Sequence, residues 1–113
     1  MTEVSTGEVW LANLDPIVGH EQSGTRPVVI ISAARLHALP INLAVVVPLT
    51  SNDRRLVTQP RIESPGTGLK RPSVARPEDI RSIDITRLQR RLGQVNAAEL
   101  AGIRRIVRYF LDL

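Results

Sequence analysis

Two uninterrupted apolar runs, at residues 27–31 and 43–49, constrain the fold of this chain more than any other feature. Each run has the length of a strand and is rich in β-branched residues, and neither alternates with polar residues. Such strands lie in the centre of a sheet with both faces covered, or in a barrel whose outer face meets an interface. The runs therefore predict a buried β core, with one outer face that a second subunit could cover.

The remaining sequence predicts further short strands, separated by turns. Residues 64–68 are a Ser, Pro and Gly cluster that marks a turn. Residues 73–83 look extended and exposed, although Pro77 removes a backbone donor and so indicates an edge or a break. Strands are predicted at residues 8–14, 27–31, 43–49, 56–63 and 91–95, and single helical turns at residues 33–39 and 84–88.

The C-terminal segment predicts an amphipathic helix. Asn96 is followed three residues later by Glu99, which resembles a capping box. One face of this helix is expected to cover the core, and the three aromatic side chains of the chain are all expected to be buried. The apolar stripe is Leu100, Ile103, Val107 and Phe110, widened by Ile106 and Leu111, and the aromatic residues are Trp10, Tyr109 and Phe110.

Five or six short strands followed by one late helix favour a mainly β fold with α, over an alternating β-α-β pattern. A small, strongly bent β-barrel with the C-terminal helix packed on it suits this order, because closure removes exposed strand edges. We find no internal repeat, linker or low-complexity segment in the 113 residues. The chain is therefore expected to form a single domain over residues 1–113.

Composition excludes several kinds of site. The chain has no cysteine, so disulfides and thiolate metal sites are excluded, and only His20 and His37 could offer imidazole ligands. We therefore expect no metal and no cofactor. No apolar run approaches the roughly 20 residues that a membrane span needs, and the N-terminus is polar and acidic. These features predict a cytoplasmic protein without membrane contact.

Charge is distributed unevenly along the chain. Residues 54–91 hold ten Lys and Arg against four Asp and Glu, a net charge of +6, whereas residues 1–53 carry a net charge of −3. A basic segment of this kind suggests a polyanionic partner, of which nucleic acid is the commonest. Because nearly all the basic residues are arginine, a compositional bias explains the charge equally well.

Polar residues gather in three stretches beside the predicted strands. A carboxylate, an imidazole and two guanidiniums would suffice for metal-free cleavage of RNA, which needs a base for the 2′-OH, cations for the phosphorane and a proton for the leaving oxygen. Taken singly, each residue also has a purely structural explanation, such as a turn cap or a surface ion pair. The stretches hold His20, Glu21 and Arg26; Thr50 and Ser51; and Arg76 and Glu78, which share one face if the chain is extended there.

Motifs along almost the whole chain resemble one known family. They are similar to the MazF/PemK toxins, the ribonuclease halves of bacterial toxin–antitoxin pairs, and most closely to the PemK/Kid branch. The motifs are Gly7-Glu-Val-Trp-Leu11, Leu14-Asp-Pro16, Gly19-His-Glu-Gln22, Gly24-Thr-Arg-Pro27, Val47-Pro-Leu-Thr-Ser51, and Ile80-Arg-Ser-Ile-Asp84 with Arg87-Leu88.

This resemblance implies a homodimeric SH3-like barrel of the CcdB/PemK type. It implies sequence-specific, metal-independent cleavage of single-stranded RNA, chiefly mRNA, that inhibits translation and growth. We expect attack by the 2′-OH, leaving a 2′,3′-cyclic phosphate and a 5′-OH. The expected partner is a cognate antitoxin whose acidic disordered tail occupies the RNA groove, with any DNA contact made only through that antitoxin.

The resemblance also implies roles for individual residues. Arg26 and Thr50 fall on the family's catalytic positions, and His20 falls on an active-site position of the PemK/Kid branch. Arg76 and Glu78 fall on a further pair at that active site, and Glu78 stands where the branch has Asp. The expected RNA-binding residues are Glu21, Gln22, Ser51, Arg54, Arg55, Arg81 and Asp79, the last of which stands where the family usually has Gln.

Two other functions are compatible with this barrel. A related branch poisons DNA gyrase through its C-terminal residues, but here the C-terminal segment is expected to cover the core and the catalytic positions are retained. A non-catalytic RNA-binding protein, or an inactivated toxin, is the other alternative, and the change from Asp to Glu at Glu78 is its only support.

Overall fold

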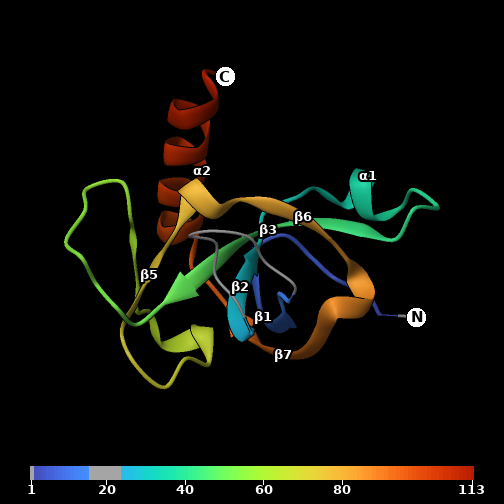
Figure 1. Ribbon diagram of the computed structural model, residues 1–113, viewed down its shortest axis with the longest axis horizontal. Helices are drawn as coiled ribbons and strands as arrows, with labels where there is room; N and C mark the ends of the chain where they lie inside the picture. The colour runs from blue at the N-terminus through green and yellow to red at the C-terminus, as the bar shows by residue number, and fades with distance from the viewer. Residues whose placement is uncertain (1, 16–23) are drawn as a thin grey trace.

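The computed structural model describes residues 2–15 and 24–113, which form a bent β-sheet with a C-terminal helix (Figure 1). The strands are ordered β4-β5-β3-β2-β1-β7, and β6 also pairs with β3. The strands are β1 (Glu8–Asn13), β2 (Thr25–Ile30), β3 (Leu43–Thr50), β4 (Arg61–Ile62), β5 (Ser73–Ala75), β6 (Arg81–Asp84) and β7 (Leu88–Gln94). The helices are α1 (Ala34–His37) and α2 (Ala97–Leu111), with 3-10 turns η1 (Pro65–Thr67), η2 (Pro77–Asp79) and η3 (Ile85–Arg87).

The longest strand, β3, organises the sheet. One side of β3 pairs with β2, and the other side pairs first with β6 and then, at the last two residues, with β5. Pro48, which has no N–H to donate, lies close to the point where β3 changes partner. The sheet therefore divides beside β3 and bends into a half-barrel, and the predicted mainly β fold with a C-terminal helix is confirmed.

Both faces of the sheet are buried within this one chain. Trp10, Val28 and Val46 belong to one apolar cluster, whereas Val29 and Val47 belong to a second cluster on the other face. Successive side chains of a strand point to opposite faces, so a strand covered on both sides needs no polar alternation. Of the two arrangements that the apolar runs allow, strands covered on both faces or a barrel with one face at an interface, the structure shows the first. A second subunit is not needed to cover these two runs.

Helix α2 closes the second cluster. Ile103 and Val107 are buried against the sheet. The predicted capping box is confirmed, because the Glu99 N–H donates to Asn96 Oδ1 at 2.8 Å and the Asn96 N–H donates to Glu99 Oε1 at 3.0 Å. The Glu99 carboxylate also accepts hydrogen bonds from the Ser64 hydroxyl and from the N–H groups of Glu63 and Ser64. The start of α2 is thereby attached to the end of β4.

The pKa of Glu99 is lowered. Partial burial of its carboxylate acts to raise the pKa, and the hydrogen bonds from Ser64, Asn96 and Glu63 outweigh that effect. Hydrogen bonds to the charged form of a carboxylate stabilise that form. Glu99 is therefore an ionised link between helix and sheet.

Two predicted elements differ from the structure. Residues 56–63 do not form a strand, because only Arg61–Ile62 pair, and a turn in which the Gln59 N–H donates to the Leu56 carbonyl comes before them. Residues 73–83 are neither continuous nor exposed: Ser73–Ala75 form a buried strand, and Pro77 then begins a 3-10 turn. The break at Pro77 was predicted, but the buried position of the preceding strand was not.

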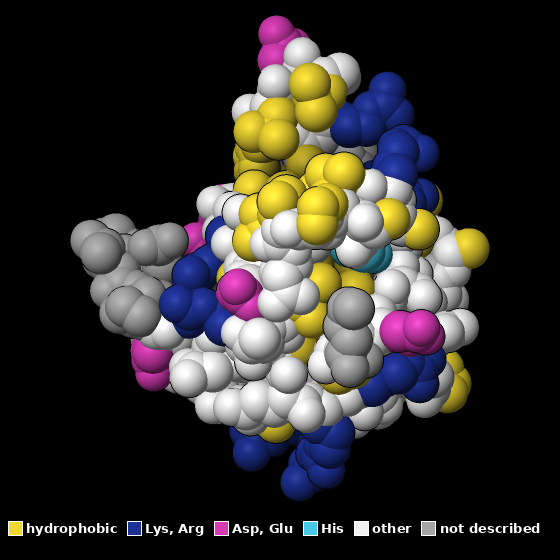
Figure 2. Space-filling model, turned by 90° about the vertical axis from the view of Figure 1, so that its right-hand side faces the viewer, with side chains coloured by type: hydrophobic (Ala, Val, Ile, Leu, Met, Phe, Trp, Pro, Cys, Tyr) yellow, Lys and Arg dark blue, Asp and Glu magenta, His cyan; other side chains and the backbone are white. Residues whose placement is uncertain are grey.

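The end of α2 also differs from the prediction. Tyr109 is 75% exposed and Phe110 is 42% exposed, and Leu111 and Leu113 are exposed too, whereas Trp10 is buried as expected. The last turns of α2 project beyond the sheet (Figure 1), and their hydrophobic side chains lie at the surface (Figure 2). The predicted helical periodicity was correct, but the sheet beneath the helix ends after Val107.

Within residues 2–15 and 24–113, no helix combines the length and the apolar composition that crossing a membrane requires.

Candidate active site

Antiparallel pairing brings two of the candidate residues together. The register of β2 and β3 sets Val28 opposite Pro48, and Arg26 and Thr50 each lie two residues beyond this pair and line the same recess. Arg26 is exposed at the start of β2, and Thr50 is half-buried at the end of β3. The strand ends therefore place a guanidinium and a hydroxyl on one rim of the sheet.

A recess of about 290 Å³ lies at this rim, and we call it the phosphate recess. Three guanidinium groups line it together with hydroxyl and amide groups, and none of its lining residues within 2–15 and 24–113 is a carboxylate. Guanidinium groups bind phosphate oxygens in a planar, bidentate manner, whereas a divalent cation would need carboxylate or other anionic oxygens. The recess therefore suits an anion. Its lining residues are Arg26, Thr50, Ser51, Asn52, Arg54, Gln59 and Arg76.

Arg76 is held in place by its neighbours. Its backbone N–H donates to the Pro48 carbonyl at 2.9 Å, and its Nη2 lies 2.9 Å from Asp79 Oδ2. Its Nε lies 3.4 Å from Glu78 Oε2, and its side chain is only 17% exposed. The sequence predicted that Arg76 and Glu78 share one face of an extended chain. They do meet, but through the 3-10 turn Pro77–Asp79, which folds both carboxylates back toward the guanidinium.

Gln59 lies at the site but was not predicted from the sequence. Its side chain is buried at 6% exposure, and its Nε2 donates to Glu78 Oε2 at 2.6 Å. A carboxylate can only accept, so this contact fixes which end of the amide is the nitrogen. The opposite atom, Oε1, is buried and has no hydrogen-bond partner among the described residues. Gln59 could not be identified from the sequence, because it lies within residues 56–63, which were predicted to form a strand, and its partner Glu78 is distant in the sequence.

The hydroxyl of Thr50 already has a structural role. Thr50 Oγ1 accepts a hydrogen bond from the Asn52 N–H at 3.1 Å, which caps the turn after β3. The turn-capping explanation for Thr50 is therefore correct. A hydroxyl has one hydrogen to donate in addition, so this cap leaves Thr50 able to bind a phosphate oxygen.

Two other candidate residues lie beside the phosphate recess. Glu78 does not line the recess but contacts Gln59 and Arg76, which do. Arg55 lines an adjoining surface recess that also includes Gln59. Arg54 and Ser51 line the phosphate recess itself.

Arg81 lies elsewhere, together with Arg87. Arg81 Nη1 donates to the Leu14 carbonyl at 3.2 Å, and Arg87 Nη1 donates to the carbonyl groups of Asn13 and Asp15. The Asp15 carboxylate in turn accepts from the Gly24 N–H at 2.8 Å. We call this group of contacts the loop clamp, because it joins both ends of the segment between β1 and β2. His20, Glu21 and Gln22 belong to that segment and lie outside the described residues.

Asp84 has a structural role next to the loop clamp. The side-chain hydroxyl and the backbone N–H of Thr86 donate to its carboxylate at 2.7 and 2.9 Å, and these bonds lower the pKa of Asp84. Asn42 donates to the same oxygen at 3.0 Å. The motif around residues 80–88 therefore caps η3 and anchors the loop base, instead of entering the phosphate recess.

The chain is similar to several known proteins. A family model described as "PemK-like, MazF-like toxin of type II toxin-antitoxin system" matches residues 5–111. The chain is 39% identical over 112 residues to endoribonuclease MazF9 of Mycobacterium tuberculosis, with 95% of each chain covered. It is also 39% identical over 85 residues to endoribonuclease PemK of Escherichia coli, covering 74% of this chain and 63% of PemK.

Solved structures share the architecture. A crystal structure of MazF from Deinococcus radiodurans matches with a TM-score of 0.86 at 25% identity, covering 97% of both chains. A mycobacterial endoribonuclease in complex with its cognate antitoxin matches with a TM-score of 0.80 at 22% identity, covering 98% of this chain and 97% of that one. The second of these matches supports the fold alone.

Proposed function

Because this chain belongs to the family of PemK-like, MazF-like toxins of type II toxin–antitoxin systems, we propose that it is an endoribonuclease toxin that cleaves single-stranded mRNA. Cleavage at specific sequences would stop translation and growth. The observation that carries this proposal is the convergence of Arg26, Thr50 and Arg76 on one recess. These three residues come from separate parts of the chain, and together they form a site for an anion.

The proposed reaction is an internal transfer that needs no metal. The 2′-OH loses its proton to Glu78 or His20, its oxygen forms a bond to phosphorus, and the bond from phosphorus to the 5′-oxygen breaks. Arg26 and Arg76 stabilise the charge of the phosphorane, Thr50 holds a phosphate oxygen, and the 5′-oxygen leaves as a hydroxyl after taking up a proton. The products are a 2′,3′-cyclic phosphate and a 5′-OH.

The geometry supports a definite arrangement of Glu78 as a base. Gln59 and Arg76 both contact the same carboxylate oxygen, Oε2. We therefore propose that the other oxygen of Glu78, Oε1, accepts the proton of the substrate 2′-OH. Gln59 would act as a positioning residue, because it holds the carboxylate and offers its own Oε1 to a donor on the RNA.

The same family membership suggests two partners. We propose a cognate antitoxin with an acidic tail, which suits the +6 charge of residues 54–91 and the guanidinium-lined recess. Antitoxin complexes occur among the matching structures, such as the MazE-MazF complex from Deinococcus radiodurans. We also propose a homodimer, which light scattering of the purified protein would test.

A gyrase-poisoning toxin is the second candidate function. We had expected the C-terminal segment to be buried against the core and therefore unable to bind gyrase. Tyr109 and Phe110 are instead exposed and could contact a partner. The phosphate recess nevertheless favours RNA cleavage. If the purified protein blocks supercoiling by gyrase and leaves RNA intact, the second candidate replaces the first.

The decisive experiment is cleavage of mRNA by the purified protein in EDTA, with mapping of the new ends. We expect full cleavage, with cyclic phosphate on one side and 5′-OH on the other. Loss of activity in EDTA, or 5′-phosphate ends, would contradict the mechanism. Binding of RNA without any cleavage would instead identify an inactivated toxin or a non-catalytic RNA-binding protein.

A further inference from the structure

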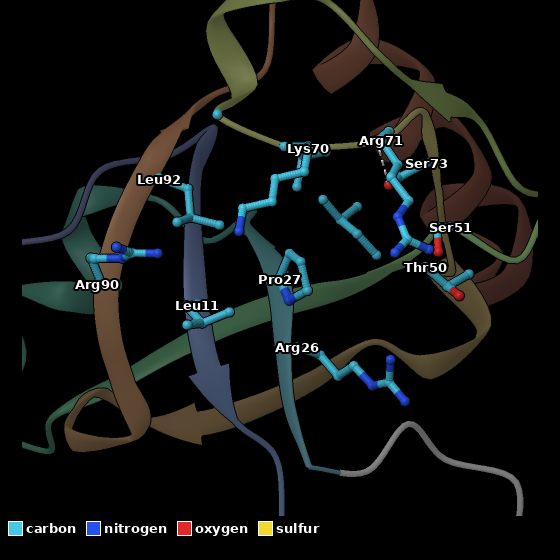
Figure 3. Close-up of a pocket in the computed structure, with 13 residues that line it drawn as sticks. Leu11, Arg26, Pro27, Thr50, Ser51, Lys70, Arg71, Ser73, Arg90 and Leu92 are labelled. Carbon is cyan, nitrogen blue, oxygen red and sulfur yellow. Dashed lines mark hydrogen bonds between the residues drawn. The ribbon is translucent and has the colours of Figure 1, made fainter.

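A second recess of about 330 Å³ adjoins the phosphate recess, and we call it the side recess (Figure 3). The two share Arg26, Thr50 and Ser51. A chain with one phosphate in the phosphate recess can therefore continue directly into the side recess. Its volume lies at the lower end of the roughly 300–1,000 Å³ range of small-ligand sites. The other lining residues are Leu11, Pro27, Leu49, Gly68, Leu69, Lys70, Arg71, Ser73, Arg90 and Leu92.

The floor of the side recess is a row of paired strand residues. Leu11 of β1 lies opposite Pro27 of β2 and opposite Arg90 of β7. Leu11 lies two residues after Val9 in β1, so the two side chains point to the same face of the sheet. Val9 belongs to the second core cluster, and the floor of the recess is therefore part of the face that α2 covers elsewhere. A part of that apolar face is therefore left open to solvent inside the recess.

Cations surround this apolar floor. Lys70 reaches from its loop toward the middle of the recess, Arg71 points toward Ser51, and Arg90 extends from β7 toward β1 (Figure 3). No carboxylate belongs to the lining in the part of the chain that the structure describes. The combination of an apolar floor and a cationic rim suits a group with one flat apolar part and one anionic part, as a nucleotide has.

The loop that carries Lys70 is fixed against β7. Gly68 has a φ of +72°, and a Cβ at this position would lie 2.0 Å from the Leu92 carbonyl oxygen. A Cβ at Gly93 would likewise lie 2.2 Å from the Gly66 carbonyl oxygen. Backbone contacts this close require glycine on both sides, and they fix the loop and strand at a constant separation. The rim is therefore largely formed before a ligand binds.

We propose that the side recess binds a nucleotide of the RNA substrate next to the scissile phosphate. Its base lies on the floor of Leu11, Pro27 and Leu92, and its phosphate contacts Lys70 and Arg90. This inference rests on the proposed function, because the two recesses must bind one strand. The apolar floor favours RNA over an acidic peptide, since a base is flat and largely apolar whereas Asp and Glu side chains are not.

The test is direct binding of uncleavable RNA. A random-sequence 2′-O-methyl RNA ten-mer would be titrated by fluorescence anisotropy at several salt concentrations. We expect Lys70→Ala combined with Arg90→Ala to weaken binding about tenfold and to reduce the salt slope by roughly 0.7 for each phosphate that is no longer neutralised. Both side chains are exposed, so the fold should be unaffected. Arg35→Ala on α1 is the matched control and should change neither quantity.

Two results would overturn this inference. The first is a double variant that binds RNA as tightly as Arg35→Ala does. The second is a double variant that keeps its RNA affinity but no longer binds a peptide of alternating Asp and Glu, which would assign the recess to an acidic peptide. The proposed function is judged separately, by whether the wild-type protein cleaves mRNA in EDTA.

Discussion

The phosphate recess and the loop clamp both depend on arginine, but their arginines have different acceptors. In the loop clamp, Arg81 and Arg87 donate to backbone carbonyl groups of residues 13–15. In the phosphate recess, Arg26, Arg54 and Arg76 line a space that suits an anion. The comparison shows that arginines of one small domain can serve either structure or chemistry. The place of each guanidinium in the fold, at the base of a loop or at the rim of a recess, decides which.

Replacing Arg26 with Ala should give the largest effect on activity. Removing one cationic donor from a site of developing charge typically costs about 10²–10³ in rate. The side chain is exposed, so the thermal unfolding midpoint should stay close to that of the wild type. Initial rates of RNA cleavage, measured beside a thermal melt, check both parts. A fully active Arg26→Ala protein would place the chemistry elsewhere.

Replacing Arg87 with Ala should reverse this pattern. The loss of hydrogen bonds from a charged donor to the carbonyl groups of Asn13 and Asp15 should destabilise the protein by about 1.5–3 kcal/mol. Urea denaturation measures this change. Activity per folded molecule should fall less than it does in Arg26→Ala. If Arg87→Ala lowers activity as strongly without any loss of stability, the division between the two groups of arginines is wrong.

Replacing Gln59 with Leu should give an intermediate loss of activity. Leucine fills a similar space but cannot hold Glu78, so we expect kcat to fall about tenfold if Glu78 is a general base, since positioned bases contribute about 10²–10⁴. The matched variant Gln59→Glu keeps the shape and places a like charge beside Glu78. It should lower kcat at least as far, because the like charges repel and displace the Glu78 carboxylate. An unchanged kcat in both variants would leave His20 as the base.

The smallest effect is expected at Glu99, which belongs with the structural contacts. The pKa of Glu99 is lowered from its usual 4.5 by hydrogen bonds in the folded protein. The carboxylate of Glu99 therefore binds a proton more tightly in the unfolded chain than in the folded protein. Ionised Glu99 stabilises the folded protein above pH 4.5, and this stabilisation is lost as the pH falls through the pKa of the folded state. The stability difference between wild type and Glu99→Gln should therefore shrink below pH 4.5. Urea melts from pH 3 to 6 test this, and a difference independent of pH would contradict it.

Much of the fold was predictable from the sequence because its signals are local. The two apolar runs, the capping box at Asn96 and the break at Pro77 each depend on neighbouring residues. The short β4 was not predictable, since its two residues pair with β5, which is distant in the sequence, and Leu56 to Gln59 form a turn before it. The exposed Tyr109 and Phe110 were missed for the same reason, because helical spacing does not show where the sheet beneath the helix ends.

The candidate site was predictable only in part. Arg26, Thr50 and Arg76 were named from their motifs, and the structure brings them to one recess. Gln59 and the side recess could not be predicted, because both depend on loops packed against strands distant in sequence. Arg81 was grouped with the RNA-binding residues, whereas its guanidinium donates to the Leu14 carbonyl in the loop clamp.

The pairing of β1 with β7 has a consequence for synthesis of the protein. Glu8 pairs with Gln94, so one edge of the sheet is completed only after most of the chain has left the ribosome. Long-range pairings of this kind form late, because the entropy of closing a long loop must be overcome first. Arg76 also enters its recess only after β5 has joined β3. A chain that ends before β5 therefore lacks both Arg76 and the strand that carries it into the recess.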